Sequence, residues 1–417
     1  MIGLKEVKGR RLIILQIVLL NLIFLNAEAQ EKILLRDVDF SSEIKDFKRS
    51  SLLILMVETP EKEKLNTIKS TFQAIEISDK FNDHSLDTNF ITLDEEAKDH
   101  SARIIEKLDE AAVARKMVAK WFGRNEKGTF SLNLVKQRGL YNASAFDREI
   151  AEKTIRGNAM LEDAGEHLIA NTFVIVNDYK YTNKEEIGEK GKEVLNIAAM
   201  FGSKAANSTT TLAADVLAKG YVIKTTSYLF RLIWDKETAG QFYGELWVTD
   251  ENYNEDAVDA FDKADFFKLE YLGQQDAWAD VQSTKYTSKS DEELIERATI
   301  KATNSAISKL ERKFEVFRTK TPLISIDPLA AKIGTKEDLA KGDKFEVLEQ
   351  ILLENGSINY EKVTEITVDH NQIWDNSYLP EEANTESAQP YTVFKGNAKK
   401  LYPGMLIRFK KNQNIFK

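Results

Sequence analysis

One stretch, residues 144–178, most constrains the fold because it predicts a long helix that leads directly into a buried strand. Ser144 can cap a helix, and apolar residues then recur at roughly helical spacing: Phe146, Ile150, Ile155, Leu161, Ala164 and Leu168. After Asn171 the pattern changes to TFVIV, whose β-branched and aromatic content is typical of a buried strand. Such a unit belongs to an α/β layer, so the neighbouring segments are expected to extend that layer.

The N-terminal residues 1–29 have the composition of a secretory signal peptide. Basic residues precede an apolar run at 12–25, and Ala27-Glu28-Ala29 provides a cleavage site of the small-x-small type. The run is shorter than the roughly 20 apolar residues that a membrane span needs. An uncleaved N-terminal anchor is the alternative interpretation. We therefore expect the mature chain to begin near Gln30.

Charge and cysteine content narrow the compartment and the class of partner. The chain has no cysteine and a formal net charge of −9. Because exported eukaryotic domains usually hold disulfides, a cysteine-free exported chain fits the envelope of a Gram-negative bacterium, in the periplasm, at the outer membrane or on the cell surface. The acidic charge argues against nucleic acid as a partner. No transmembrane span is expected after the signal peptide, and association with a membrane surface is left open.

Hydrophobic periodicity predicts the elements of a core domain at 30–330. The expected strands are 51–57, 90–93, 172–176, 221–235, 241–248, 266–272 and a closing strand at 323–326. The expected helices are 62–81, 101–122 and a helix from Ser290 to about Phe317, whose start has the sequence of a capping box with Glu293. Residues 125–143 are expected to form a connection with one short extended piece, and Gly240 a hairpin turn.

These elements predict an α+β fold, an α/β core with a mixed sheet and flanking helices. The core can be divided into two subdomains, 30–180 and 181–330. Residues 335–417 contain short extended runs separated by Gly, Asn or Pro, which is the pattern of a small SH3-like β-barrel. We place the boundary between Asp327 and Lys341.

Residues 194–218 are rich in Ala, Ser and Thr and hold only two charged residues, Lys204 and Asp215. One interpretation is a hairpin of short helices that docks on a partner or on a membrane. The other, which we favour, is a helical hairpin packed on its own sheet, because small residues permit close approach of backbones.

Sequence motifs give no catalytic, cofactor-binding or metal-ligating residue. The four histidines, His84, His100, His167 and His370, form no His-Glu-x-x-His motif, and no Gly-x-Ser-x-Gly elbow occurs. Residues 188–192 lack the spacing of a phosphate-binding loop. Residues 250–254 resemble the start of a calcium loop, but Glu255 and Phe261 occupy positions that require Gly and Glu. A weak carboxylate calcium site there is the alternative. We predict no site residues and no cofactor.

Tryptophan could line a sugar-binding face, but the sequence patterns favour core positions. Trp121, Trp234 and Trp247 sit among apolar residues. Trp374, beside Asp375 and Asn376, is the most exposed candidate, although packing is favoured for it as well.

The segments 333–339 (IGTKEDL), 342–347 (GDKFEV) and 363–368 (VTEITV) form a glycine-aspartate turn that leads into barrel strands after an α/β domain. In this, the C-terminal third resembles bacterial periplasmic accessory proteins of the flagellar assembly protein T and TolB N-terminal domain kind. The resemblance implies a non-enzymatic binding role in envelope assemblies and carries over no site residue.

Together these observations predict an exported, non-enzymatic envelope protein that acts as a scaffold or binding component. Its expected partners are other envelope proteins, with 194–218 as one candidate contact, and homo-oligomer formation is left open. The alternatives are a cell-surface glycan-binding protein and a hydrolase that uses a carboxylate pair.

Overall fold

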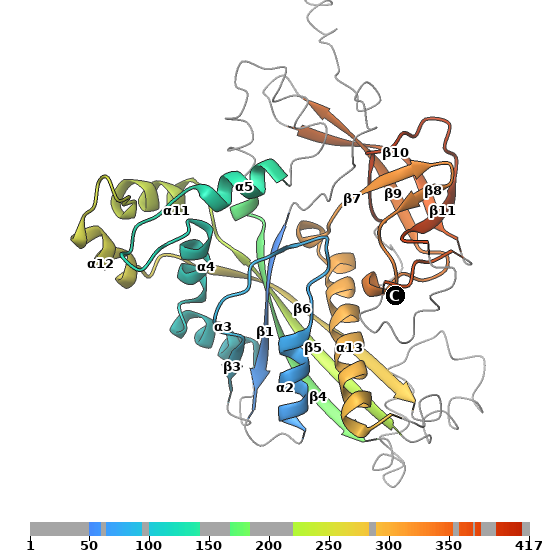
Figure 1. Cartoon of the computed structure of the whole chain (residues 1–417), viewed down its shortest axis with the longest axis horizontal. Helices are drawn as coiled ribbons and strands as arrows, with labels where there is room; N and C mark the ends of the chain where they lie inside the picture. Colours follow the sequence, from blue (N-terminus) through green and yellow to red (C-terminus); the bar gives the residue numbers. More distant parts are fainter. Residues whose placement is uncertain are drawn as a thin grey trace, which may run out of the picture.

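The fold consists of an α+β part followed by a closed barrel of six strands (Figure 1). The computed structural model describes residues 50–59, 64–93, 100–141, 167–183, 220–282, 289–352, 358–369, 372–376 and 389–410. The predicted signal peptide, the predicted helix preceding His167 and the segment 194–218 lie outside these residues. No helix among the described residues is long and apolar enough to cross a membrane.

A mixed sheet forms the centre of the α+β part. Its strands follow the order β2-β1-β4-β5-β6, and β3 also pairs with β1. The strands are β1 (Ser51–Glu58), β2 (Asn82–Asp83), β3 (Phe90–Thr92), β4 (Thr172–Asn183), β5 (Gly220–Leu232) and β6 (Leu269–Gln282). β1 runs parallel to β2, β3 and β4, whereas β4-β5 and β5-β6 are antiparallel. β4 and β5 pair along their lengths, so residues 30–180 and 181–330 both contribute strands to one sheet.

Strand β1 is apolar along its length because both of its faces are covered. Leu53, Leu55 and Val57 pack into one hydrophobic core, and Leu52 and Met56 point into the other. The predicted strands at 51–57 and 172–176 are therefore confirmed. Strands β1 and β3, which lie before and after α2 in the chain, are parallel neighbours.

Helices cover the two faces unequally (Figure 1). One face carries α2 (Leu65–Ala74) and α13 (Asp291–Lys313). The other carries α3 (His100–Glu110), α4 (Val113–Trp121), α5 (Asn133–Tyr141), α11 (Lys236–Gln241), a π-helix (Phe242–Leu246) and α12 (Glu255–Lys263). Short 3₁₀ turns occur at Glu315–Phe317 and Thr335–Glu337.

Three predicted elements in the α+β part were wrong. The single helix at 101–122 is two helices, since Ala112 adopts a left-handed conformation (φ 49°) between α3 and α4. The extended piece at 125–143 is replaced by α5. The strand at 241–248 is instead α11 and the π-helix, because the Asp235 carboxylate accepts a hydrogen bond from Thr238 N (2.9 Å) and starts a helix there.

Helix α13 confirms the predicted capping box. Ser290 Oγ accepts from Glu293 N (3.2 Å), and the Glu293 carboxylate accepts from Ser290 N (2.7 Å). Its apolar residues at steps of four are buried: Leu294, Ala298, Ala302, Ala306 and Leu310. The helix ends at Lys313, a few residues before the predicted end.

We expect Ser290→Ala to lower the free energy of unfolding by about 1 kcal/mol, because it removes the side-chain acceptor at the helix start. Chemical denaturation of the purified chain would measure this. Ser290→Asp, which restores an acceptor, should lie close to the wild type. Equal stabilities of Ser290→Ala and wild type would show that the cap contributes nothing.

The C-terminal barrel consists of antiparallel pairs in the closed order β10-β11-β8-β7-β12-β9. Its strands are β7 (Thr321–Ile326), β8 (Leu329–Ala331), β9 (Lys344–Leu352), β10 (Ile358–Val368), β11 (Thr392–Gly396) and β12 (Leu406–Phe409). The predicted core strand at 323–326 is wrong, because β7 pairs with β8 and β12 in the barrel. The barrel strands thus begin at Thr321, before the predicted boundary.

Candidate functional site

A buried glutamate in the barrel part joins it to the α+β part. Glu337, 5% exposed, lies in the 3₁₀ turn between β8 and β9. Its carboxylate accepts from Ser78 Oγ (2.7 Å), Gly334 N (2.7 Å) and Asn376 Nδ2 (2.9 Å). Ser78 belongs to the loop between α2 and β2, so this one carboxylate links three separate segments. Its hydrogen bonds offset the cost of burying a charge.

Gly334 is required beside this carboxylate by close packing. A Cβ at this position would lie 2.1 Å from the carbonyl oxygen of Trp374 and 2.6 Å from Asn376 Oδ1. The Trp374 carbonyl also accepts a hydrogen bond from Thr335 N (3.0 Å). Any larger residue would therefore push the 3₁₀ turn away from the segment that it binds.

A second buried carboxylate, that of Glu311 near the end of α13, contacts both the α+β part and the segment that leads into the barrel. Glu311 is 1% exposed and forms an ion pair with Lys80 Nζ at 2.5 Å. Its other oxygen accepts hydrogen bonds from the backbone N–H and the hydroxyl of Thr319, just before β7. Lys80 comes from the same α2-β2 loop as Ser78. We call the contacts of Glu337 and Glu311 with this loop the joint.

Aromatic packing completes the joint. Phe81, beside Lys80, stacks on Phe317 with ring centroids 5.3 Å apart. Phe173 of β4 packs edge-on against Phe317 at 5.0 Å. The Arg312 guanidinium lies over the Phe409 ring of β12 at 4.5 Å and donates to the Asp338 carbonyl at 2.8 Å. Apolar, aromatic and charged contacts thus connect the sheet, α13 and the barrel.

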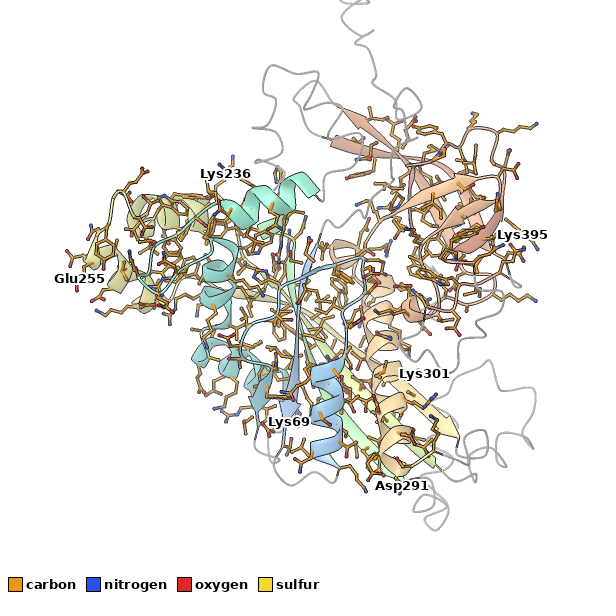
Figure 2. The ribbon with its side chains drawn as sticks, viewed as in Figure 1. Lys69, Lys236, Glu255, Asp291, Lys301 and Lys395 are labelled. Atoms are coloured by element: carbon orange, nitrogen blue, oxygen red, sulfur yellow. The ribbon has the colours of Figure 1, made fainter. Side chains whose placement is uncertain are left out.

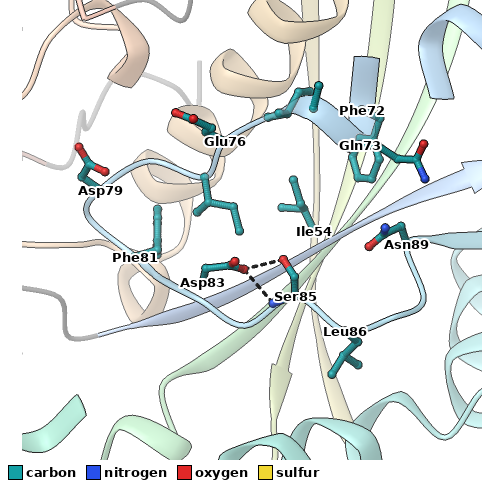
Figure 3. Close-up of a pocket in the computed structure, with 13 residues that line it drawn as sticks. Ile54, Phe72, Gln73, Glu76, Asp79, Phe81, Asp83, Ser85, Leu86 and Asn89 are labelled. Carbon is teal, nitrogen blue, oxygen red and sulfur yellow. Dashed lines mark hydrogen bonds between the residues drawn. The ribbon is translucent and has the colours of Figure 1, made fainter. Parts of the chain in front are cut away.

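A hollow of about 550 Å³ opens beside the joint, between α2 and the edge of β1 (Figure 3). Its apolar lining includes Ile54 and Phe72, and its polar lining includes three carboxylates, Glu76, Asp79 and Asp83. Figure 3 shows Glu76 and Asp79 on one side of the hollow and the amides of Gln73 and Asn89 on the other. Asp83 lies between them, and its Oδ1 accepts from Ser85 N (2.8 Å) and Ser85 Oγ (2.5 Å).

A buried polar cluster lies under the opposite face of the sheet, around His84. The ring is fully buried, with Nε2 3.0 Å from the Met117 carbonyl and Nδ1 2.9 Å from Arg138 Nη1. Since the guanidinium only donates, Nδ1 is the acceptor and Nε2 carries the proton. Arg138 also donates to Ser51 Oγ (3.0 Å) and the Asp83 carbonyl (2.7 Å), and it lies over the Trp121 ring.

The surroundings of His84 favour a neutral imidazole. Burial, reinforced by the positive charge of Arg138, lowers the pKa of His84 from 6.5 to about 3. Burial also lowers the pKa of Arg138 to about 10, so its guanidinium remains charged near neutral pH. With both ring nitrogens bonded and no exposure, His84 has a structural role in joining β2 to α4 and α5.

The remaining residues singled out in the sequence are dispersed. His100 Nδ1 lies 3.4 Å from Asp178 at the surface, His167 is exposed, and His370 lies outside the described residues. In the segment that resembles a calcium loop, Asn254 caps α12 by accepting from Asp256 N (3.0 Å). No group of three or more His, Cys, Asp or Glu in the described part of the chain could hold a metal ion.

The tryptophan predictions are confirmed in part. Trp121 is fully buried, and Trp234 and Trp247 pack against the same hydrophobic core. Trp374 is half-buried, and its backbone carbonyl and N–H both bind other segments.

Sequence reasoning missed the joint, the hollow and the His84 cluster. Glu337, Glu311 and Arg138 lie in charged stretches that are usually solvated, and their partners are distant in the sequence. The chain matches no protein-family model and no curated protein.

Proposed function

We propose that this protein is an exported, non-enzymatic binding component of a bacterial envelope assembly, whose α+β part and barrel act together as one body. The joint is the observation that carries the proposal, because buried carboxylates in two places bind the same loop of the α+β part. A rigid connection of this kind presents surfaces of two modules to a partner in a fixed relation. We further propose that the barrel is of the SH3-like kind.

Export is part of the proposal and rests on the N-terminal sequence, which has a basic region, an apolar run and a small-x-small site. The sequence resemblance to periplasmic accessory proteins supports the same role. We propose residues 194–218 as one contact with a partner, because of their low charge.

Site-specific photo-crosslinking in the native envelope tests the scaffold role. Exposed positions on both modules are available, including Lys301 on α13, Lys395 on β11 and Glu255 on α12 (Figure 2). We expect one defined envelope protein to be captured from at least one position on the barrel and one on the α+β part. Capture from one module only, or no product above that of a chain without the crosslinker, would contradict a composite surface.

A matched chain that lacks 194–218 tests that segment separately. We expect the crosslinked product to decrease strongly while circular dichroism shows a folded protein. An undiminished product would remove the segment from the proposed interface.

A carboxylate-dependent hydrolase is the second candidate, because the hollow brings Glu76, Asp79 and Asp83 to one place. Against it, the Asp83 carboxylate is already occupied by two hydrogen bonds from Ser85. Turnover of oligosaccharides by the wild type that is abolished in Glu76→Gln would favour this candidate over the scaffold.

A further inference from the structure

On one edge of β1, neither of the neighbouring strands β2 and β3 pairs with Ile54, which leaves a gap in the sheet. Strand β2 pairs with β1 up to Leu52, and β3 pairs with it from Met56 onward. On this edge the Leu52 carbonyl accepts from His84 N (2.9 Å) and Met56 N donates to the Asn89 carbonyl (3.0 Å). Because a parallel strand bonds its two neighbours with alternate residues, the N–H and C=O of Ile54 face the same edge.

The gap opens into the hollow beside the joint. Ile54 lines that hollow and is only 7% exposed. In the described part of the chain, no backbone hydrogen bond joins Ile54 to residues 84–89, which leave the sheet at this point. A sheltered peptide group without a partner costs roughly 1–3 kcal/mol, so a ligand that offers both a donor and an acceptor would bind favourably there. The hollow has the size of a small-molecule site.

The charge of the residues that line the hollow favours a positively charged ligand. Three carboxylates and no lysine or arginine line the hollow. The neighbouring amines already have partners, since Lys80 Nζ binds Glu311 and Lys120 Nζ donates to the backbone carbonyl of Ser85. The carboxylates of Glu76 and Asp79 are exposed on one side of the hollow, at a distance along it from the amides of Gln73 and Asn89 (Figure 3).

We propose that this hollow binds an organic cation that carries an amide, of which a lysine residue within a peptide is the simplest form. The amide pairs with the free N–H and C=O of Ile54, as in the addition of one residue to a strand edge. The ammonium group extends toward Glu76 and Asp79 on one side of the hollow (Figure 3). This binding does not depend on the scaffold role proposed above.

Titration with Nα-acetyl-lysine amide, followed by NMR or calorimetry, tests the proposal on the full mature chain. We expect the double variant Glu76→Gln/Asp79→Asn to bind this probe about tenfold more weakly, because two exposed charge contacts together contribute on the order of 1–2 kcal/mol. Nα-acetyl-norleucine amide, which lacks the ammonium, should bind the wild type more weakly by a similar factor. Butylammonium, which lacks the amide, should also bind more weakly.

Glu237→Gln/Glu251→Gln is the matched control, since it removes two exposed carboxylates that do not line the hollow. Its affinity for the probe should equal that of the wild type. No saturable binding of the lysine probe to the wild type would overturn the proposal. If Nα-acetyl-norleucine amide bound as tightly as the lysine probe, the proposal that the ligand is a cation would be overturned. If a neutral sugar bound more tightly than the lysine probe, the hollow would be a glycan-binding site instead.

Discussion

Replacing Glu311 by alanine is expected to lower the free energy of unfolding by about 3–5 kcal/mol, the largest single effect that the structure predicts. The substitution leaves the ammonium of Lys80, whose side chain is 9% exposed, without its 2.5 Å carboxylate partner. It also removes the acceptor for the backbone and hydroxyl of Thr319, at the start of the barrel. Breaking a buried pair costs far more than an exposed pair, because the remaining charge cannot be solvated. Urea denaturation at neutral pH measures the change.

Two further variants distinguish the loss of this buried ion pair from the loss of any charged side chain. Lys107→Ala breaks the exposed pair with Glu110 (2.7 Å) and should cost less than about 1 kcal/mol. Lys80→Met combined with Glu311→Leu removes both charges and should recover much of the lost stability, because apolar replacements of a buried pair are often neutral. If the unfolding free energy of Glu311→Ala lies within about 1 kcal/mol of that of the wild type, the pair of Lys80 and Glu311 does not stabilise the joint.

The sequence was sufficient for elements whose pattern is local and apolar. The run at 51–57 has the continuous apolar pattern of a strand covered on both faces, and the capping box at Ser290 marks a helix start with side chains three residues apart. The alternate apolar residues Tyr228, Phe230 and Leu232 pack into one hydrophobic core. In each case the interacting groups lie close in the sequence, so spacing carries the information.

The wrong predictions arose where tertiary contacts overrode local preference. Residues 241–248 have strong β-propensity, but Phe242 and Leu246 lie four apart and both are buried when the segment is helical. The wrong placement of the strand at 323–326 has the same origin, since this strand pairs with β8 and β12, which follow it in the sequence.

The joint could not be predicted from the sequence, because the sequence does not distinguish a solvent-exposed charged residue from one that is buried in an ion pair. Glu337 and Ser78, which share a 2.7 Å hydrogen bond, are separated by 259 positions. Glu311 lies in a charged helix end where its neighbours Arg312 and Lys313 give no sign that it alone is buried. Only the fold identifies which carboxylates are buried, and therefore which substitutions should loosen the barrel from the sheet.

The second large effect is a loss of stability in weak acid caused by His84. Its pKa in the folded protein is about 3, against 6.5 for an exposed imidazole. Between these values the unfolded chain binds a proton that the folded protein excludes, so stability is constant above pH 6.5 and falls as the pH is lowered toward 3. From pH 7 to pH 5 this residue alone should remove about 2 kcal/mol of unfolding free energy, at 1.36 kcal/mol for each pH unit below 6.5.

His84→Gln isolates that contribution. The glutamine amide can still donate to the Met117 carbonyl and accept from Arg138, but it cannot take up a proton. Its stability should therefore vary less between pH 7 and pH 5 than that of the wild type, by about 2 kcal/mol, whatever its stability at pH 7. Denaturation curves at several pH values measure both slopes, and because all other titrating groups are common to the two proteins, their difference reports His84. Parallel slopes would mean that the folded protein accommodates a protonated ring. The neutral imidazole bonded to Met117 and Arg138 would then not be the state that stabilises this end of the sheet.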